Sequence, residues 1–310
     1  MPVPLRFIGC ETELMETVFI TGGSSTLGQH VLRSLVSRVR IMAVVHRRKI
    51  EIPDAEMELF HGGLEEIARS PVALHRAQVV LHMAAVTHSD NPSEYFQVNT
   101  ELTKRLLSLC GSSHHFVYIS TVCAHPSGGA YGRSKWLAEE AVRKSGINYT
   151  IIRPAEIYGS TDNEGIDALI AFARKGRILL DFRCGGSIRY APISAREAAQ
   201  FIAVATICRR RVGQTYTICA ERACAAPEIA RALRSSVRPL FVLPVPVTML
   251  RAAKALRLPL PFKSDQIDRL VLPKTYDIAL ARRDYDFQPH SFLDYLARSR
   301  KITAGADPGR

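Results

Sequence analysis

Tyr131 and Lys135 have residue types and a spacing suited to proton transfer. They lie four residues apart in the run AYGRSKWLAEEAV, which we expect to be helical, so both side chains fall on one face, one turn apart. A tyrosine free in water has a pKa of about 10, and a neighbouring ammonium favours the phenolate. We therefore expect Lys135 to lower the pKa of Tyr131, which could then exchange a proton with an alcohol or carbonyl.

A hydroxyl residue precedes this pair at the end of a strand-like run. The run HFVYIST ends in Ser120 and Thr121, and a hydroxyl there could hold a substrate oxygen for Tyr131. The Tyr-x-x-x-Lys spacing also arises often by chance. By itself it would describe an ordinary helix surface.

A glycine-rich turn lies near the start of the chain, in VFITGGSSTLGQHVLRSL. Glycines let the backbone approach a pyrophosphate, and the N-terminus of the following helix offers unpaired N–H groups. A plain strand–helix turn looks similar, but the position between a strand and a helix favours a dinucleotide. The residues expected to face this cofactor are Gly22, Ser24, Ser25, Thr26, Leu27 and Gly28.

The end of the second strand-like run indicates which dinucleotide is bound. An Asp or Glu there would hydrogen-bond the adenosine ribose and favour NAD, whereas a cation accommodates the 2′-phosphate of NADP. This chain has His46, Arg47 and Arg48, and its first acid is Glu51. Arginine binds phosphate as a planar fork, so we expect NADP. NAD stays the alternative, with these cations simply facing water.

Apolar strand-like runs alternate with helix-like runs through the first half. The expected strands are 17–21, 40–45, 57–60, 78–83, 115–120 and 149–152, with helices near 93–110 and 130–144. This order predicts an α/β fold: a doubly wound, Rossmann-like parallel sheet. We expect an N-terminal extension (1–16), a dinucleotide-binding domain (17–157) and a flexible tail (300–310). Residues 158–299 should form mainly a smaller substrate-binding lobe, loop-rich over 158–192, with some elements returning to the sheet.

Composition narrows the class of partner. The 310 residues carry a net charge of +12, but the basic residues are scattered, so we expect no nucleic-acid partner. No apolar run is long enough for a membrane span. Seven cysteines without a CxxC pattern suggest neither a disulfide framework nor a metal site, and free thiols fit a reducing, cytoplasmic location.

Five runs in order carry a resemblance to a known family: TGGSSTLG, VVLHMAA, VYIST, YGRSK and IIRPAEIYG. Together they resemble the extended short-chain dehydrogenase/reductases, the NAD-dependent epimerase/dehydratase relatives, many of which act on nucleotide sugars. The similarity runs from about Thr17 to Ala199 and more faintly to Phe292. These five runs are specific for the fold and much less specific for the substrate.

The resemblance implies a set of functional residues. Thr121, Tyr131 and Lys135 would be catalytic, and the last two would also contact the cofactor. Asn99 would bind the cofactor and support the active site, or would be a helix-packing amide. Arg189 would meet a nucleotide diphosphate, or would be an exposed loop arginine. Further cofactor contacts would be Leu64, Met83, Ala84, Ala85, Pro154, Ala155 and Ile157, and the substrate side would include Thr87, Thr121, Glu156 and Arg189.

The chain departs from the family pattern in places that bear on the reaction. Ser25 stands for the usual middle glycine, Gly63 for an Asp, and PISAREAA for a His-Val-x-Asp-like run. Val122 and Cys123 occupy the places where dehydratases carry an acidic pair, which disfavours dehydration.

An NADP-leaning site fits NADPH-dependent reduction of a ketone on a small molecule, such as a nucleotide sugar. Steroid-like and other carbonyls stay open as substrates. Nucleotide-sugar epimerisation is the alternative chemistry, and a non-catalytic dinucleotide-binding regulator or assembly subunit is the alternative of another class. The resemblance also allows a homodimer through the face of the catalytic helix.

Overall fold

The computed structural model describes residues 15–46, 48–52, 56–63, 72–159, 165–234, 237, 239–256, 264–272 and 276–298. Its centre is a seven-stranded sheet in the order β11-β6-β5-β4-β1-β2-β3, with every neighbouring pair parallel. The strands are β1 (Thr17–Thr21), β2 (Arg40–Val45), β3 (Met57–His61), β4 (Val79–His82), β5 (His115–Ile119), β6 (Asn148–Pro154) and β11 (Gln214–Ile218). The doubly wound, Rossmann-like sheet expected from the sequence is confirmed.

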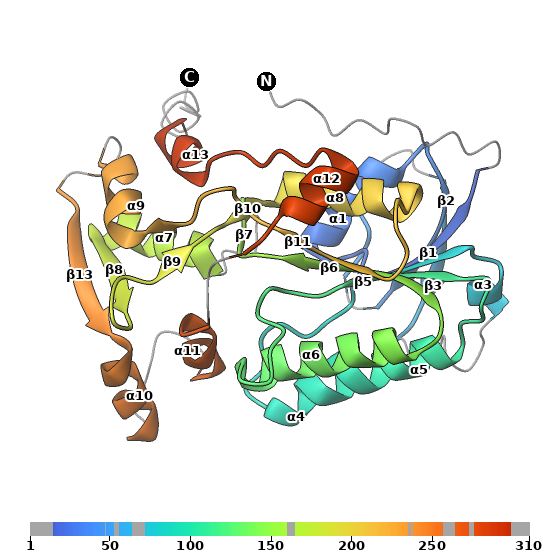
Figure 1. Cartoon of the computed structure of the whole chain (residues 1–310), viewed down its shortest axis with the longest axis horizontal. Helices are drawn as coiled ribbons and strands as arrows, with labels where there is room; N and C mark the ends of the chain where they lie inside the picture. Colours follow the sequence, from blue (N-terminus) through green and yellow to red (C-terminus); the bar gives the residue numbers. More distant parts are fainter. Residues whose placement is uncertain are drawn as a thin grey trace.

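Helices cover both faces of this sheet (Figure 1). One face carries α1 (Thr26–Leu35), α8 (Ala195–Cys208) and α12 (Ala279–Tyr285). The other carries α3 (Val72–His75), α4 (Pro92–Tyr95), the π-helical segment η1 (Phe96–Glu101), α5 (Leu102–Ser108) and α6 (Gly129–Lys144). Separate buried apolar clusters fill the two interfaces. Burial on both faces explains why β1, β4 and β5 are nearly continuous apolar runs rather than alternating ones.

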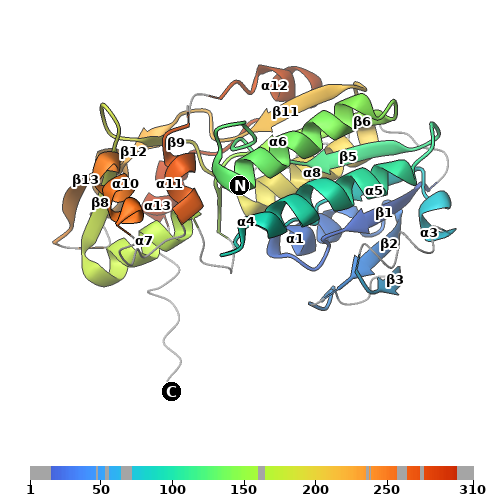
Figure 2. The ribbon, with the colours of Figure 1, turned by 90° about the horizontal axis from the view of Figure 1, so that it is seen from below.

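Part of the chain after residue 158 returns to the sheet. β11 pairs with β6, and α8 and α12 pack on the same face as α1. The other elements form the expected smaller lobe, which has its own buried apolar core beside the sheet (Figure 2). They are β7 (Ile157–Tyr158), α7 (Gly165–Gly176), β8 (Ile178–Arg183), β9 (Arg189–Tyr190), β10 (Ile193–Ser194), β12 (Cys224–Ala225), α9 (Ala226–Leu233), β13 (Phe241–Pro246), α10 (Val247–Ala255), α11 (Ser264–Leu270) and α13 (Phe292–Arg298).

The expectation of a loop-rich stretch over 158–192 is wrong, because α7 and β8 lie within it. In α7, Ile166, Ile170 and Ala173 are buried, and their helical spacing places them on one face against the lobe core. The glycines of this stretch lie mostly at element ends rather than inside the elements. Gly165, for example, is the first residue of α7 and has φ +55.

The cysteines correct one expectation drawn from composition. Cys110, Cys123, Cys184, Cys219 and Cys224 are free thiols, but Cys208 is disulfide-bonded, which corrects the expectation of free thiols at that residue. Within the described ranges, no helix has the length and apolar character to cross a bilayer. No cluster of three or more His, Cys, Asp or Glu suited to a metal ion occurs in the same ranges. The tail (300–310) and nearly all of the N-terminal extension lie outside the described residues.

Candidate active site

The turn after β1 and the segment after β4 meet at the point where strand order reverses. β1 lies between β2 and β4, the place where doubly wound sheets bind ligands. Gly22 has φ +75, and a Cβ there would lie 2.5 Å from the Ala84 nitrogen and 2.7 Å from the Met83 carbonyl carbon. Only glycine fits this contact. The structure therefore brings together two segments that the sequence assigned to the cofactor.

The glycine-rich turn is closed by a side-chain cap. Ser25 Oγ accepts a hydrogen bond from the Gly28 nitrogen at 3.0 Å and donates one to the Gly22 carbonyl at 2.9 Å. Ser25 has φ −71 and ψ 161, so its replacement of the family glycine causes no strain. A Cβ at Gly28 would collide with the Gly22 and Gly23 carbonyl oxygens. The turn is thus a compact cradle in front of the α1 N-terminus, suited to a pyrophosphate.

The residues expected to choose between NAD and NADP follow β2. His46 and Arg48 are exposed. Gln29 of α1 fixes the loop beyond them, because its side chain donates to the Lys49 carbonyl at 3.1 Å and accepts from the Glu51 nitrogen at 3.2 Å. Arg47 and Leu64 lie outside the described residues.

Tyr131 and Thr121 lie together at the carboxyl end of β5. Tyr131 is 8% exposed, and the Thr121 side chain lies close enough to its hydroxyl to favour the phenolate and act on its pKa. Burial raises the pKa of Tyr131 to about 12, although Arg269 and the Thr121 side chain oppose the rise. The expectation of a lowered Tyr131 pKa is therefore wrong in this structure, because desolvation outweighs the nearby positive charge.

Lys135 is buried, and its ammonium contacts residues of β5. Its Nζ donates to the Ile119 carbonyl at 2.7 Å and lies 4.2 Å from the centroid of the Tyr118 ring. Burial lowers the pKa of Lys135 to about 7, and the Glu139 carboxylate acts in the opposite direction. The structure thus keeps the lysine on the same helix face as Tyr131, with an ammonium that loses its proton unusually easily.

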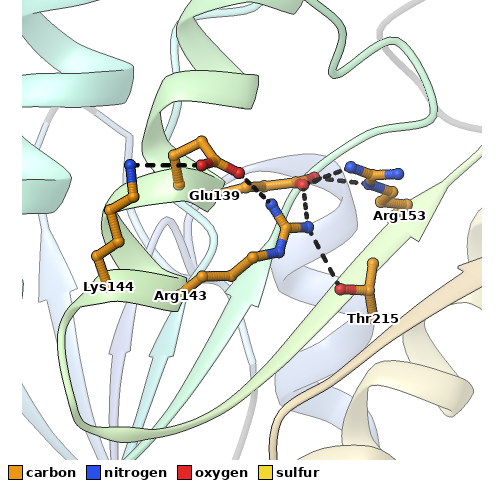
Figure 3. A network of polar contacts seen from close by, with 6 residues as sticks. Glu139, Arg143, Lys144, Arg153 and Thr215 are labelled. Carbon is orange, nitrogen blue, oxygen red and sulfur yellow. Dashed lines mark hydrogen bonds and ion pairs between the residues drawn. The ribbon is translucent and has the colours of Figure 1, made fainter.

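A charged network anchors α6 one turn beyond Lys135 (Figure 3). The buried Glu139 carboxylate accepts hydrogen bonds from Arg153 Nε on β6 at 2.7 Å and from Arg143 Nη2 at 2.7 Å. Arg143 also donates to Thr215 of β11 at 3.4 Å. Because β6 and β11 belong to the main sheet, the network fixes the helix that carries Tyr131 and Lys135.

A buried histidine links β1, β4 and α5. The two ring nitrogens of His82 lie 2.6 Å from Thr21 Oγ1 and 2.9 Å from Thr103 Oγ1. Burial, followed by the Lys135 charge, lowers the pKa of His82 to about 3, so the ring is neutral. Thr21 also accepts from the Ala84 nitrogen at 3.3 Å. Sequence reasoning missed this positioning role, although the histidine ends the run VVLH.

Asn99 holds the segment after β4 against α6. Its Oδ1 accepts from the Val86 nitrogen at 2.8 Å, and its Nδ2 donates to the Val86 carbonyl and to Ser134 Oγ, both at 3.0 Å. Asn99 lies in η1, the π-helical part of the helix expected over 93–110, and such π segments occur often at functional sites. These bonds join the segment after β4 to α6, so Asn99 positions both; its expected contact with the cofactor stays a prediction.

The expected substrate-side residues, and the cofactor residues expected after β6, are distributed between the sheet and the lobe. Thr87 is exposed and lies 3.1 Å from His88 Nδ1. Pro154 and Ala155 are buried, whereas Glu156 and Ile157 are half-buried. The charge of Glu156 contributes to the raised pKa of Tyr190 in β9, which places this carboxylate at the boundary of the lobe.

Arg189 has partners within the lobe itself. Its guanidinium donates to the Ala223 carbonyl and lies 3.5 Å from Glu228. Arg189 is exposed and lies in β9, and its expected role toward a diphosphate stays a prediction. The unusual PISAREAA run is explained by capping, because Ser194 accepts from the Glu197 nitrogen at 3.1 Å at the start of α8.

Arg269 of α11 is a site residue that no sequence pattern indicated. Its Cζ lies 4.8 Å from the centroid of the Tyr131 ring, and its charge lowers the Tyr131 pKa against the effect of burial. The helix packs on α6, and Gln266 of the same helix lies 3.1 Å from His88. The lobe thus brings a cation to the side of the sheet that carries the tyrosine.

Comparison with known proteins agrees with this geometry. Residues 18–205, more than half of the chain, match the family model described as the NAD dependent epimerase/dehydratase family. The chain belongs to the NAD-dependent epimerase/dehydratase family. Its fold resembles that of MoeE5 in complex with UDP-glucose and NAD, with a TM-score of 0.69 at 18% identity, covering 93% of this chain and 98% of that chain.

Two curated proteins are similar to this chain in sequence. Ceramide reductase of Caulobacter vibrioides is 30% identical over 172 residues, 53% of this chain and 53% of that protein. Sterol-4-alpha-carboxylate 3-dehydrogenase, decarboxylating, of Candida albicans is 25% identical over 201 residues, 54% and 57% of the two chains. The chain spans about half the length of these curated relatives.

The Gly22 contact generates a prediction with a matched control. Gly22 and Gly146 have nearly the same φ, +75 and +74, but a Cβ at Gly146 would meet nothing within 4 Å. Gly146→Ala should cost about 1–2 kcal/mol of unfolding free energy from its left-handed backbone alone. Gly22→Ala should cost more and weaken dinucleotide binding, as measured by urea unfolding and fluorescence titration. Equal losses of stability with unchanged binding would contradict the cradle.

Proposed function

We propose that this family member is an NAD(P)-dependent oxidoreductase that reduces a ketone on a small molecule, with Tyr131 as the general acid. The observation that carries the proposal is that Tyr131 is buried beside Thr121 and Arg269, with a pKa of about 12 that keeps its hydroxyl protonated. Such a tyrosine is protonated at neutral pH and ready to donate. The carbonyl oxygen that becomes an alkoxide during reduction needs this donor.

The residues around the strand-order reversal fit a dinucleotide. Gly22, Ser25 and Gly28 form a cradle that a Cβ would fill, at the N-terminus of α1. We assign the pyrophosphate to this turn, the nicotinamide side to Met83–Ala85 and the ribose to Lys135. When bound, the cofactor supplies the hydride. Asn99 and His82 hold the surrounding segments in place.

The side chains then divide the work at the carbonyl. Thr121 hydrogen-bonds the substrate oxygen and aligns it with Tyr131. As negative charge develops on that oxygen, Tyr131 donates its proton, and the adjacent Arg269 guanidinium stabilises the phenolate that results. In the direction of alcohol oxidation the same groups act in reverse.

We place an apolar carbonyl compound above a nucleotide sugar as the substrate. The curated relatives are named for a ceramide and a sterol carboxylate, which are lipids, although the MoeE5 complex holds UDP-glucose. Arg189, the expected diphosphate ligand, is paired with Glu228. Epimerisation stays the alternative chemistry. It would show no net change in dinucleotide absorbance, whereas a reductase consumes NADPH.

We further propose NADPH as the preferred cofactor, because cations and no acid follow β2 for the first residues of the loop. Changing Arg47 and Arg48 together to Ala should weaken NADPH about tenfold and leave NADH unchanged, since charge-assisted hydrogen bonds to one phosphate would be lost. Lys175→Ala, in the lobe, is the matched control. Fluorescence titration measures the affinity of each variant for NADPH and NADH. Equal NADPH and NADH affinities in the wild type would refute the preference.

Tyr131→Phe should lower kcat about 100-fold or more, since the ring still packs but no proton can be donated. Dinucleotide affinity should change little, because the assigned cradle lies at Gly22–Gly28. The measurement is NADPH consumption with a panel of apolar and sugar-nucleotide ketones, with Tyr149→Phe on β6 as the control. Near wild-type turnover in Tyr131→Phe would show that another group supplies the proton.

A further inference from the structure

The lobe carries exposed apolar side chains that no described element covers. Phe241 and Leu243 of β13 are 63% and 50% exposed, and Met249 and Leu256, in and just after α10, are 63% and 71% exposed. Ile178 of β8 is 36% exposed. We call these five residues, with the exposed Ala252, the apolar patch. Single exposed apolar residues are ordinary, but a cluster of large ones marks a contact surface.

The patch has regular geometry. Phe241 is in register with Ile178 across the β13–β8 pair, and Leu243, two residues on, points to the same face. In α10, Met249, Ala252 and Leu256 have the spacing of one helix face. Val247 and Leu250 are buried. Figures 1 and 2 both place β8, β13 and α10 at the end of the molecule opposite to β3 and α3.

The free edge of β13 is poorly suited to pairing with another strand. The Phe241 nitrogen donates to the Arg177 carbonyl, toward β8, so alternation directs the nitrogens of residues 242, 244 and 246 to the outer edge. Pro244 and Pro246 supply no N–H there. Such prolines block strand addition. Recognition at this end therefore depends on the side chains of the patch.

The charge around the patch is positive. Exposed Arg174, Lys175 and Arg177 precede β8, and the exposed Arg251 lies on α10. Residues 239–256 contain no Asp or Glu. The acid of β8, Asp181, is buried and bonded to Arg183 and Ser187. The nearby Asp268 of α11 is paired with Lys254 of α10. Apolar side chains flanked by cations, on segments that carry no exposed acid of their own, are the combination that partitions into the interface of an anionic bilayer.

We propose that the apolar patch docks this protein on the surface of anionic lipid membranes. Phe241, Leu243, Met249 and Leu256 enter the interface, and Arg251 with Arg174–Arg177 contacts the lipid head groups. The chain after α10 leads to α11, which packs against α10 and carries Arg269 to Tyr131. The docked face is therefore continuous with the element that lies over the candidate active site. This docking does not depend on the reaction assigned above.

Co-sedimentation of the full chain with lipid vesicles tests the docking. We expect binding to vesicles of phosphatidylcholine with phosphatidylglycerol, weaker binding to phosphatidylcholine alone, and release by salt. Phe241→Ser with Leu243→Ser should lower the partition coefficient about tenfold or more, from the apolar area lost. Arg251→Glu should lower it about fivefold or more on the anionic vesicles. Val72→Ser and Val212→Ser, at exposed apolar residues elsewhere, should change nothing.

Met249→Ser with Leu256→Ser provides a second, independent variant, and thermal unfolding establishes that each variant is folded. Absence of binding to either vesicle, or equal binding by the patch variants and the controls, overturns the proposal. A patch variant that converts a dimer to a monomer in sedimentation while vesicle binding is absent would assign the surface to a second copy of the chain, which also overturns it.

Discussion

The burial of Lys135 is the constraint on which the site depends. An ammonium loses hydration when it is buried, and this cost lowers the pKa of Lys135 to about 7. The Ile119 carbonyl, the Tyr118 ring and the field of Glu139 offset part of the cost. Glu139 is buried too, and it is held there by Arg153 and Arg143. The position of α6 thus depends on partners from β5 and β6.

The same ammonium influences the other half of the site. It contributes to the low pKa of His82, whose neutral ring joins Thr21 of β1 to Thr103 of α5. Thr21 in turn accepts from Ala84, against which Gly22 packs. The Lys135 charge and the hydrogen bonds of His82 and Thr21 therefore couple α6 to the assigned dinucleotide cradle. A substitution at Lys135 should therefore alter the pKa of His82, because the Lys135 charge helps to keep the histidine ring neutral.

Sequence patterns predicted the features that depend on residues close together in the chain. Apolar runs gave the strands of the main sheet, the glycine turn located the cradle, and four-residue spacing put Tyr131 and Lys135 on one helix face. The direction of the Tyr131 pKa could not be predicted this way, because it depends on burial by Tyr95 and on Arg269 from a distant helix. The helix within 158–192 was missed because its flanking glycines resembled those of loops. Asn99 was recognised, but its partners Val86 and Ser134 became evident only in three dimensions.

The central claim is that Tyr131 transfers the proton while Arg269 opposes the effect of burial on its pKa. The most direct measurement is kcat against pH for alcohol oxidation by the wild type, by Arg269→Met and by Lys254→Met. Lys254 of α10 is the control. It donates a hydrogen bond at 3.1 Å to Asp268, the neighbour of Arg269 in α11, and is not among the groups that act on the Tyr131 pKa. Loss of the guanidinium should raise the Tyr131 pKa and move the rise in kcat to higher pH in Arg269→Met alone. A profile that stays in place in Arg269→Met, or one that moves equally in Lys254→Met, would contradict the account.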